Sequence, residues 1–176
     1  MERELINPEN FVSNSTGLWS KQWLLLTSGD HKSKEYNTMT VGWGSIGTMW
    51  NKPFVQVVVR PTRFTYEFME KYDSFTLTAF PEKYKDQLKY LGTVSVRDED
   101  KILGSGLTII SSEKIEAPGF EEAELIIECK KIYWDDLRSE NFIDGKIEES
   151  YPEKDYHRIY FGEILAISGT TKFIFN

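Results

Sequence analysis

The feature that most constrains this chain is a series of segments rich in β-branched and aromatic residues, each bounded by turn-forming residues. These segments predict strands at 22–28, 36–43, 54–60, 75–80, 123–133 and 156–167, with a short edge strand at 173–175. Strands outnumber helices and do not alternate with them as in βαβ units. The pattern therefore predicts a mainly β fold, an antiparallel barrel with a few peripheral helices.

Two helices interrupt the predicted strands. The first is expected at 66–71, with Thr65 as its N-cap residue. The second is expected at 82–91 and should end at Gly92, a natural residue for the position after a helix. Residues 134–154 mix charge, Asn, Gly and Pro without a clear period, which predicts a long surface excursion.

Length and charge limit the classes of function. A chain of 176 residues has the size of one domain, so we expect a single domain spanning 1–176. Its net charge of -7 argues against general binding to nucleic acid or to an anionic membrane. The start of the chain lacks the apolar region of a signal peptide, and its one cysteine, Cys129, cannot form an intramolecular disulfide. We therefore expect a cytoplasmic protein with no membrane span.

The segment from Tyr36 to Pro53 is a strand that leads into glycines at 42, 44 and 47. Glycine lets a backbone approach a flat ligand closely or adopt positive φ, which exposes peptide N–H groups. The segment predicts a loop that hydrogen-bonds the polar edge of a ring. A long hairpin with glycines at its bends is the alternative.

A second informative segment, Val59 to Tyr66, places Arg60 and Arg63 around a proline at the junction of a strand and a helix. Guanidinium groups, a capping hydroxyl from Thr65 and the free N–H groups of a helix start together favour a phosphate site. The alternative is a capped helix with solvated arginines.

Metal and nucleophile chemistry find little support in the sequence. His31 and His157 have no cysteine or second histidine at ligand spacing, and no Walker or nucleophile-elbow pattern is present. Cys129 lies in an alternating, strand-like run, which is typical of a quiet, half-buried thiol.

Taken in order, five segments resemble the flavin reductase-like family of FMN-binding split-barrel proteins. The matching segments are 37–40 with the glycines that follow, 60–65, 95–101, 128–133 and 156–164. The long connection from Tyr133 to Tyr156, with Asp135-Asp136-Leu137, Phe142 and Tyr151-Pro152, resembles its flavoredoxin-like members most closely. Val96 departs from the family pattern at a glycine position, whereas Lys101 is retained. The resemblance implies a split barrel that binds FMN.

The resemblance also implies roles for individual residues. The backbone of 38–40 and 43–46 would face the isoalloxazine, and basic and hydroxyl side chains would surround the phosphate or ribityl chain. The cofactor-binding residues implied are Asn37, Thr38, Met39, Thr40, Trp43, Ser45, Ile46, Arg60, Arg63, Thr65 and Lys101. As the catalytic residue it implies His157, which we expect at the open face of the flavin, donating to a flavin or nicotinamide carbonyl. A strand histidine satisfied by backbone is the alternative.

The function implied is that of an NAD(P)H-dependent flavin reductase, with NADH or NADPH as electron donor and a possible monooxygenase partner. An FMN electron carrier served by another redox protein is the alternative, and a split-barrel binding module that has lost flavin is a third. The resemblance further implies a homodimer with FMN at the subunit boundary.

Overall fold

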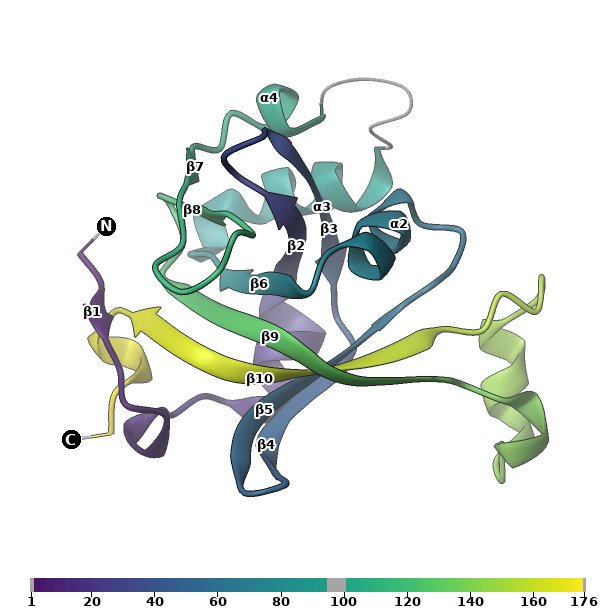
Figure 1. The fold of residues 1–176 in the computed structure, drawn as a ribbon. Helices are drawn as coiled ribbons and strands as arrows, with labels where there is room; N and C mark the ends of the chain where they lie inside the picture. Colours follow the sequence, from purple (N-terminus) through teal and green to yellow (C-terminus); the bar gives the residue numbers. More distant parts are fainter. Residues whose placement is uncertain (1, 95–100, 176) are drawn as a thin grey trace.

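The computed structural model describes residues 2–94 and 101–175. Its main feature is an eight-stranded antiparallel sheet in the order β3-β2-β6-β9-β10-β5-β4, with β1 added to β10 (Figure 1). The strands are β1 (Glu4–Leu5), β2 (Leu24–Asp30), β3 (Glu35–Val41), β4 (Gly44–Met49), β5 (Lys52–Val59), β6 (Ser74–Ala79), β9 (Leu125–Asp136) and β10 (Arg158–Gly169). A separate small ladder joins β7 (Ile109–Ile110) to β8 (Gly119–Phe120). The mainly β, antiparallel prediction is confirmed.

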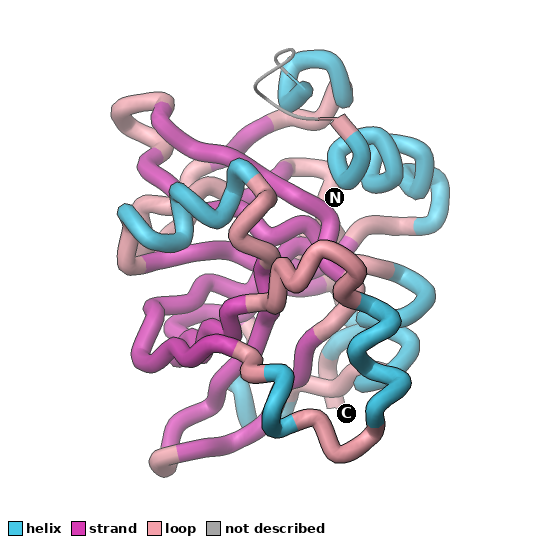
Figure 2. The backbone as a smooth tube through the Cα atoms, turned by 90° about the vertical axis from the view of Figure 1, so that its right-hand side faces the viewer, coloured by secondary structure: helices cyan, strands magenta, loops and turns pink. Residues whose placement is uncertain are grey.

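The helices lie outside the sheet (Figure 2). They are α1 (Ser15–Gly17), α2 (Phe64–Lys71), α3 (Lys85–Thr93) and α4 (Lys101–Ser105), accompanied by short 3₁₀ turns and a π turn at Leu18–Gln22. Both α2 and α3 contact β3. This packing places the start of α2 and the end of α3 beside the same strand.

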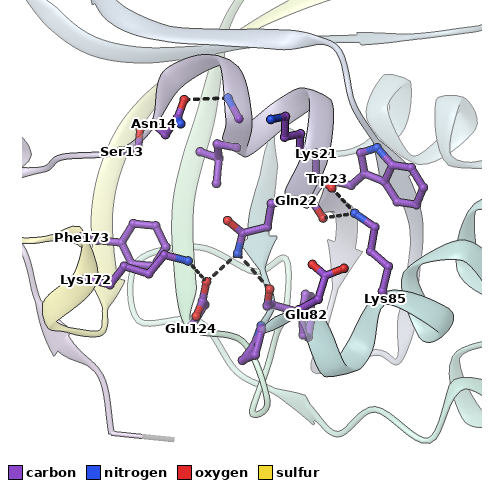
Figure 3. Close-up of a pocket in the computed structure, with 14 residues that line it drawn as sticks. Ser13, Asn14, Lys21, Gln22, Trp23, Glu82, Lys85, Glu124, Lys172 and Phe173 are labelled. Atoms are coloured by element: carbon purple, nitrogen blue, oxygen red, sulfur yellow. Dashed lines mark hydrogen bonds and ion pairs between the residues drawn. The ribbon is translucent and has the colours of Figure 1, made fainter.

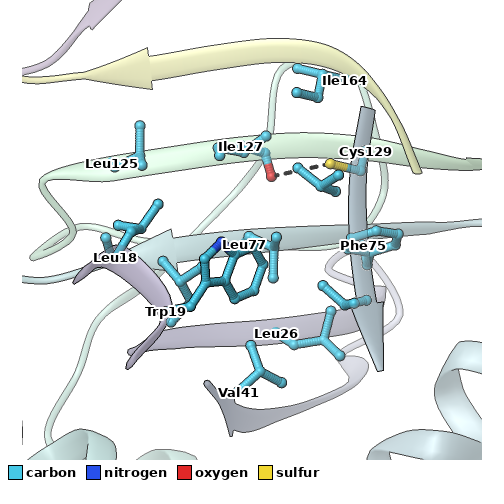
Figure 4. Close-up of a cluster of buried hydrophobic side chains, with 14 of the residues drawn as sticks. Leu18, Trp19, Leu26, Val41, Phe75, Leu77, Leu125, Ile127, Cys129 and Ile164 are labelled. Carbon is cyan, nitrogen blue, oxygen red and sulfur yellow. Dashed lines mark hydrogen bonds between the residues drawn. The ribbon is translucent and has the colours of Figure 1, made fainter. Parts of the chain in front are cut away.

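Strand β2 is buried on both faces because a different apolar cluster covers each side. Leu24 and Leu26 point into the main core, which Figure 4 shows between the strands and the π turn. Leu25 points the opposite way, into a second cluster with Leu88 and Leu91 of α3. Successive side chains of a strand point to opposite faces of the sheet. An unbroken apolar run, such as residues 24–26, is therefore expected only where both faces are covered.

All six longer predicted strands are confirmed, with ends displaced by a few residues. The edge strand expected at 173–175 is wrong. Phe173 ends a 3₁₀ turn, its ring is buried, and the chain makes only an isolated bridge from Ile174 to Phe11.

The glycine-rich segment after β3 is a strand rather than a loop. Gly44 and Gly47 belong to β4, which pairs along β5, and neither has positive φ. A Cβ on Gly44 would lie 2.4 Å from the carbonyl oxygen of Gln56 and 2.5 Å from the ring of Trp19. The glycines therefore permit close packing inside the protein. The alternative is correct in that β4 and β5 form a hairpin, but Gly44 and Gly47 do not lie at its bend, which is formed by Trp50 and Asn51.

Both helix boundaries differ from their predictions. Helix α2 begins at Phe64, because Arg63 takes extended backbone (φ -80, ψ 133) and occupies the N-cap position. Thr65 is therefore inside the helix. Gly92 lies within α3, which ends before Val94, and a Cβ there would come within 3.1 Å of Thr40. The glycine allows α3 to pack closely on β3 instead of ending the helix.

The expected surface excursion is present between β9 and β10, where it projects to the right of the two strands in Figure 1. Strand β9 extends to Asp136, so the excursion begins later than predicted. It contains two 3₁₀ turns, Ser139–Asn141 and Gly145–Ser150.

Candidate functional site

Two small cavities lie next to each other beside the end of β3. We call the first, of about 180 Å³, the β3 cavity; it is lined by Met39, Thr40, Val41, Gly42, Trp43, Val58, Arg60, Arg63 and His157. We call the second, of about 90 Å³, the α2 cavity; it is lined by Asn37, Met39, Thr62, Arg63, Phe64, Thr65, Leu91, Gly92, Thr93, Val94 and Lys101. Met39 and Arg63 belong to both linings, so the two cavities are neighbours separated by these side chains.

Among the residues that line the α2 cavity within 2–94 and 101–175, two are cations and none is acidic. Lys101 is only 4% exposed, and its Nζ donates to the carbonyl oxygen of Leu91 at 3.2 Å. Arg63 donates to the carbonyl oxygen of Gly92 at 3.4 Å. Burial, and secondarily the charge of Arg63, lower the pKa of Lys101 to about 8. The start of α2 adds its own positive dipole end, so the cavity suits an anion.

Asn37 and Thr65 form a buried polar pair in the wall of the α2 cavity. The Asn37 amide donates to the Thr65 hydroxyl at 2.9 Å. Asn37 Oδ1 is buried and has no hydrogen-bond partner in the described part of the chain. A buried acceptor without a donor is unfavourable, so this wall fits a ligand that carries a hydroxyl or N–H group. The Thr65 hydroxyl serves this pair and does not cap the helix.

His157 is 8% exposed and lies between the protein interior and the β3 cavity. Its Nδ1 lies 2.9 Å from the hydroxyl of Tyr151, and its ring lies 5.2 Å from that of Trp43. Burial, and next the charge of Arg60, lower the pKa of His157 to about 4. The imidazole is therefore neutral near pH 7.

Arg60 lines only the β3 cavity, and its guanidinium is already engaged. It pairs with Asp155 at 2.6 Å, donates to the carbonyl oxygen of Ser150 at 2.7 Å and lies 5.0 Å from the centre of the Tyr151 ring. The two predicted arginines thus differ. Arg63 lines the α2 cavity beside Lys101, whereas Arg60 binds residues of the excursion and holds that segment against the β3 cavity.

The structure gathers most predicted site residues but not all of them. The side chains of Thr38, Ser45 and Ile46 line neither cavity. Thr38 donates to the carbonyl oxygen of Leu26, Ser45 donates to Gln56, and Ile46 packs against the core. The prediction that their backbone faces a ring stays a prediction. Of the family-like segment 95–101, only Lys101 falls within the described residues.

Sequence reasoning missed Tyr151, Asp155 and the end of α3 as parts of the site. Asp155 pairs with an arginine 95 positions away, and no local pattern marks such a contact. The resemblance covers Tyr151-Pro152 and Tyr156-His157 but implies no site role for Tyr151.

Other candidate sites are less suited to a ligand. A larger cavity of about 900 Å³ lies between the π turn and the start of α3 (Figure 3). Its polar groups are largely paired: Glu124 accepts from Gln22 and Lys172, and Lys85 lies over the Trp23 ring. Cys129 is buried, and burial raises the pKa of its thiol well above the usual range.

Residues 2–94 and 101–175 contain neither a metal-binding cluster nor a membrane-spanning helix. No group of three or more His, Cys, Asp or Glu side chains is placed to hold a metal ion. No helix there has the length and apolar character needed to cross a membrane.

Comparison with known proteins gives a consistent result. The family model described as "Flavin reductase like domain" matches residues 18–172. An uncharacterized protein of Pyrococcus abyssi is 26% identical over 152 residues, covering 85% of this chain and 74% of the relative. An uncharacterized protein of Escherichia coli is 30% identical over 108 residues, covering 61% of this chain and 57% of the relative.

Solved structures share the fold at low sequence identity. An FMN-binding domain of a flavin reductases-like enzyme from Shewanella baltica has a TM-score of 0.69 at 16% identity, covering 97% of this chain and 78% of that chain. Flavoredoxin of Desulfovibrio vulgaris has a TM-score of 0.66 at 22% identity, covering 91% and 74%. An NADH:FAD oxidoreductase of Streptomyces globisporus, in complex with NAD and FAD fragments, has a TM-score of 0.63 at 15% identity, covering 85% and 74%.

The buried charge of Lys101 gives a prediction about stability. Because the folded-state pKa is lowered to about 8, the folded state disfavours the charged amine. Above the unfolded pKa near 10.5, the amine is neutral in both states and does not reduce the free energy of unfolding. As pH falls from there through 8, the unfolded state binds a proton more readily than the folded state, so the free energy of unfolding decreases. Lys101→Met should therefore raise the free energy of unfolding of the ligand-free protein at pH 7, on the order of 1–2 kcal/mol.

Urea unfolding at pH 7 and pH 10.5 measures this effect. The gain should shrink at the higher pH, and Lys89→Met, at an exposed lysine of α3, is the matched control. A Lys101 variant that is less stable at pH 7 would contradict an uncompensated buried charge.

Proposed function

Because the chain belongs to the flavin reductase-like family, we propose that it binds FMN in the neighbouring β3 and α2 cavities and acts as an NAD(P)H-dependent flavin oxidoreductase. The single observation that carries this proposal is the pair of cations, Lys101 and Arg63, in an α2 cavity where no acidic side chain is found among the described lining residues. A phosphate would supply the missing negative charge.

The α2 cavity fits the phosphate and ribityl end of FMN. Lys101 and Arg63 offer charge, and the N–H groups at the start of α2 offer further donors. Asn37 Oδ1 lacks a donor, which a ribityl hydroxyl would provide. The protein carries a net charge of -7, so this local basic cluster must overcome an unfavourable long-range field.

The β3 cavity suits the ring end of the cofactor. Met39 and the exposed indole of Trp43 offer apolar surface, and the backbone between Thr40 and Gly42 is available for hydrogen bonds to a ring edge. His157 adds a neutral imidazole. When bound, FMN supplies the capacity to accept a hydride from a reduced nicotinamide, so the chain itself needs no nucleophile. Its own residues bind and orient the rings.

An FMN electron carrier is the second candidate, favoured by the likeness to the Desulfovibrio vulgaris flavoredoxin. A carrier takes electrons from a redox protein and needs no nicotinamide site. The two candidates share the FMN site and differ in the electron donor, so the donor decides between them.

We also propose a homodimer that covers exposed aromatic surface, of which Trp43 also lines the β3 cavity. Trp43, Trp50, Tyr133 and Trp134 are each roughly half exposed. Trp50 and Tyr133 contact Phe161 and form one aromatic face across the β4–β5 turn, β9 and β10. Exposed apolar surface of this kind is typical of an interface.

Removal of Arg63 tests the phosphate site. A charge-assisted hydrogen bond contributes about 1.5–3 kcal/mol, so Arg63→Ala should weaken FMN binding roughly tenfold to a hundredfold. Riboflavin lacks the phosphate and should lose little. Fluorescence titration of both flavins measures this contrast, with Arg138→Ala, at an exposed arginine of the excursion, as control. Equal losses for the two flavins would place the phosphate elsewhere.

Anaerobic stopped-flow absorbance separates reductase from carrier. Mixing the FMN-loaded protein with NADH or NADPH should bleach the bound flavin at a rate that depends on nicotinamide concentration. No bleaching with either nucleotide, while dithionite reduces the same sample, would support the carrier instead. Protein that neither purifies with FMN nor binds added FMN would contradict both.

Light scattering tests the homodimer. We expect the FMN-loaded form to have about twice the 20.5 kDa mass of the chain, and dilution to release flavin together with dissociation. Trp50→Asn should weaken the dimer while keeping the turn, because Trp50 has positive φ, which asparagine tolerates. Ile143→Asp, at an exposed residue of the excursion, is the matched control. A clean 20.5 kDa species would be inconsistent with the proposal.

A further inference from the structure

The excursion between β9 and β10 brings one tyrosine back into the protein. Tyr151 is 3% exposed although it lies in a surface segment. Its ring stacks with Phe142 at 5.9 Å, contacts Tyr156 at 5.1 Å and lies under the guanidinium of Arg60. These contacts hold the phenol in one place, against His157.

Which atom donates in the Tyr151–His157 hydrogen bond follows from the need of the phenol proton for an acceptor. The two atoms lie 2.9 Å apart, and either could donate in principle. In residues 2–94 and 101–175 the Tyr151 hydroxyl has no other hydrogen-bond partner. If Nδ1–H were the donor, the phenol proton would be buried without an acceptor, which is costly. Burial also raises the pKa of Tyr151, so the phenol keeps its proton and donates it to Nδ1.

An imidazole that accepts at Nδ1 and is neutral must carry its proton on Nε2. Burial keeps His157 neutral near pH 7. Within the described residues no side chain or carbonyl hydrogen-bonds Nε2, and the residue lines the β3 cavity beside Trp43. The ring therefore keeps one N–H group available to a ligand.

We propose that Tyr151 is a positioning residue that holds His157 in its neutral Nε2–H tautomer, so that the β3 cavity presents a fixed N–H donor to the carbonyl oxygen of a bound ring. This inference deepens the proposed function and rests on it for the identity of the ligand. A flavin ring carbonyl and the carboxamide of a nicotinamide share the required chemistry. His157 then acts as a hydrogen-bond donor and does not release a proton.

Nitrogen NMR of the ligand-free protein reads the tautomer directly. Long-range ¹H–¹⁵N spectra of histidine-labelled protein distinguish a protonated from an unprotonated ring nitrogen. We expect Nδ1 of His157 to be unprotonated and Nε2 to carry the proton at pH 7. A protonated Nδ1 in the wild type would overturn the proposal, whatever the protein binds.

Tyr151→Phe removes the donor and keeps the ring that packs against Phe142 and Arg60. We expect the His157 spectrum to shift toward a mixture of tautomers. Tyr156→Phe is the matched control, because it lies in the same aromatic cluster but its hydroxyl donates to Glu148 instead. An unchanged His157 spectrum in Tyr151→Phe, or an equal change in the control, would contradict the proposal.

Ligand affinity then tests the consequence. Tyr151→Phe should weaken the ligand that meets His157 by roughly 2-fold to 10-fold, the range of one hydrogen bond. A loss in FMN affinity would identify a flavin carbonyl, whereas a loss only in the NADH dependence of flavin reduction would identify the carboxamide. No loss in either would overturn the donor role.

Repeating Tyr151→Phe in a His157→Gln protein distinguishes an effect on the His157 tautomer from an effect on packing. Glutamine at 157 offers an amide N–H that has no tautomer to set. In a His157→Gln protein, Tyr151→Phe should therefore change affinity less than twofold. An equal loss in both backgrounds would mean that Tyr151 acts only through packing. If the wild type binds neither FMN nor NADH, the proposed function fails, while the NMR result still decides the role of Tyr151.

Discussion

The antiparallel pairing of β9 with β10 is the interaction on which the rest of the structure depends. β9 also pairs with β6, and β10 also pairs with β5, so these two strands join the β3-β2-β6 part of the sheet to the β5-β4 part. Register shifts on either side of Gly162 to Ile164 mark irregularities that let such long strands bend. The excursion that connects β9 to β10 carries Tyr151, Asp155 and His157 to the β3 cavity.

The site combines groups that are unfavourable on their own. In the part of the chain that the structure describes, Lys101 and Arg63 share a cavity without a counter-charge in its lining, and Asn37 Oδ1 is buried without a donor. Such groups reduce the stability of the ligand-free protein, and a phosphate ligand with hydroxyl groups would satisfy them. The apolar clusters on the two faces of β2 contribute stability that offsets this cost.

The two arginines show how position in the fold changes the role of a side chain. Both flank Pro61 and appear equivalent in the sequence. In the fold, Arg60 meets Asp155, Ser150 and the Tyr151 ring, while Arg63 points between the two cavities. One arginine therefore anchors a segment and the other is available to an anion.

The sequence by itself determined the six longer strands and the antiparallel class, because period-two burial is a local feature. Local pattern also marked Arg60, Arg63 and Thr65, whereas the other site residues were implied by the resemblance to the flavin reductase-like family. Tertiary structure alone decided that Gly44 and Gly92 serve packing, since their neighbours, Gln56 and Thr40, come from other elements. It also decided that Tyr151 fixes His157 and that Thr65 pairs with Asn37, 28 residues away. A hydrogen bond between side chains that the fold brings together leaves no pattern in either local sequence, because neither partner changes the propensity of its own strand, turn or helix.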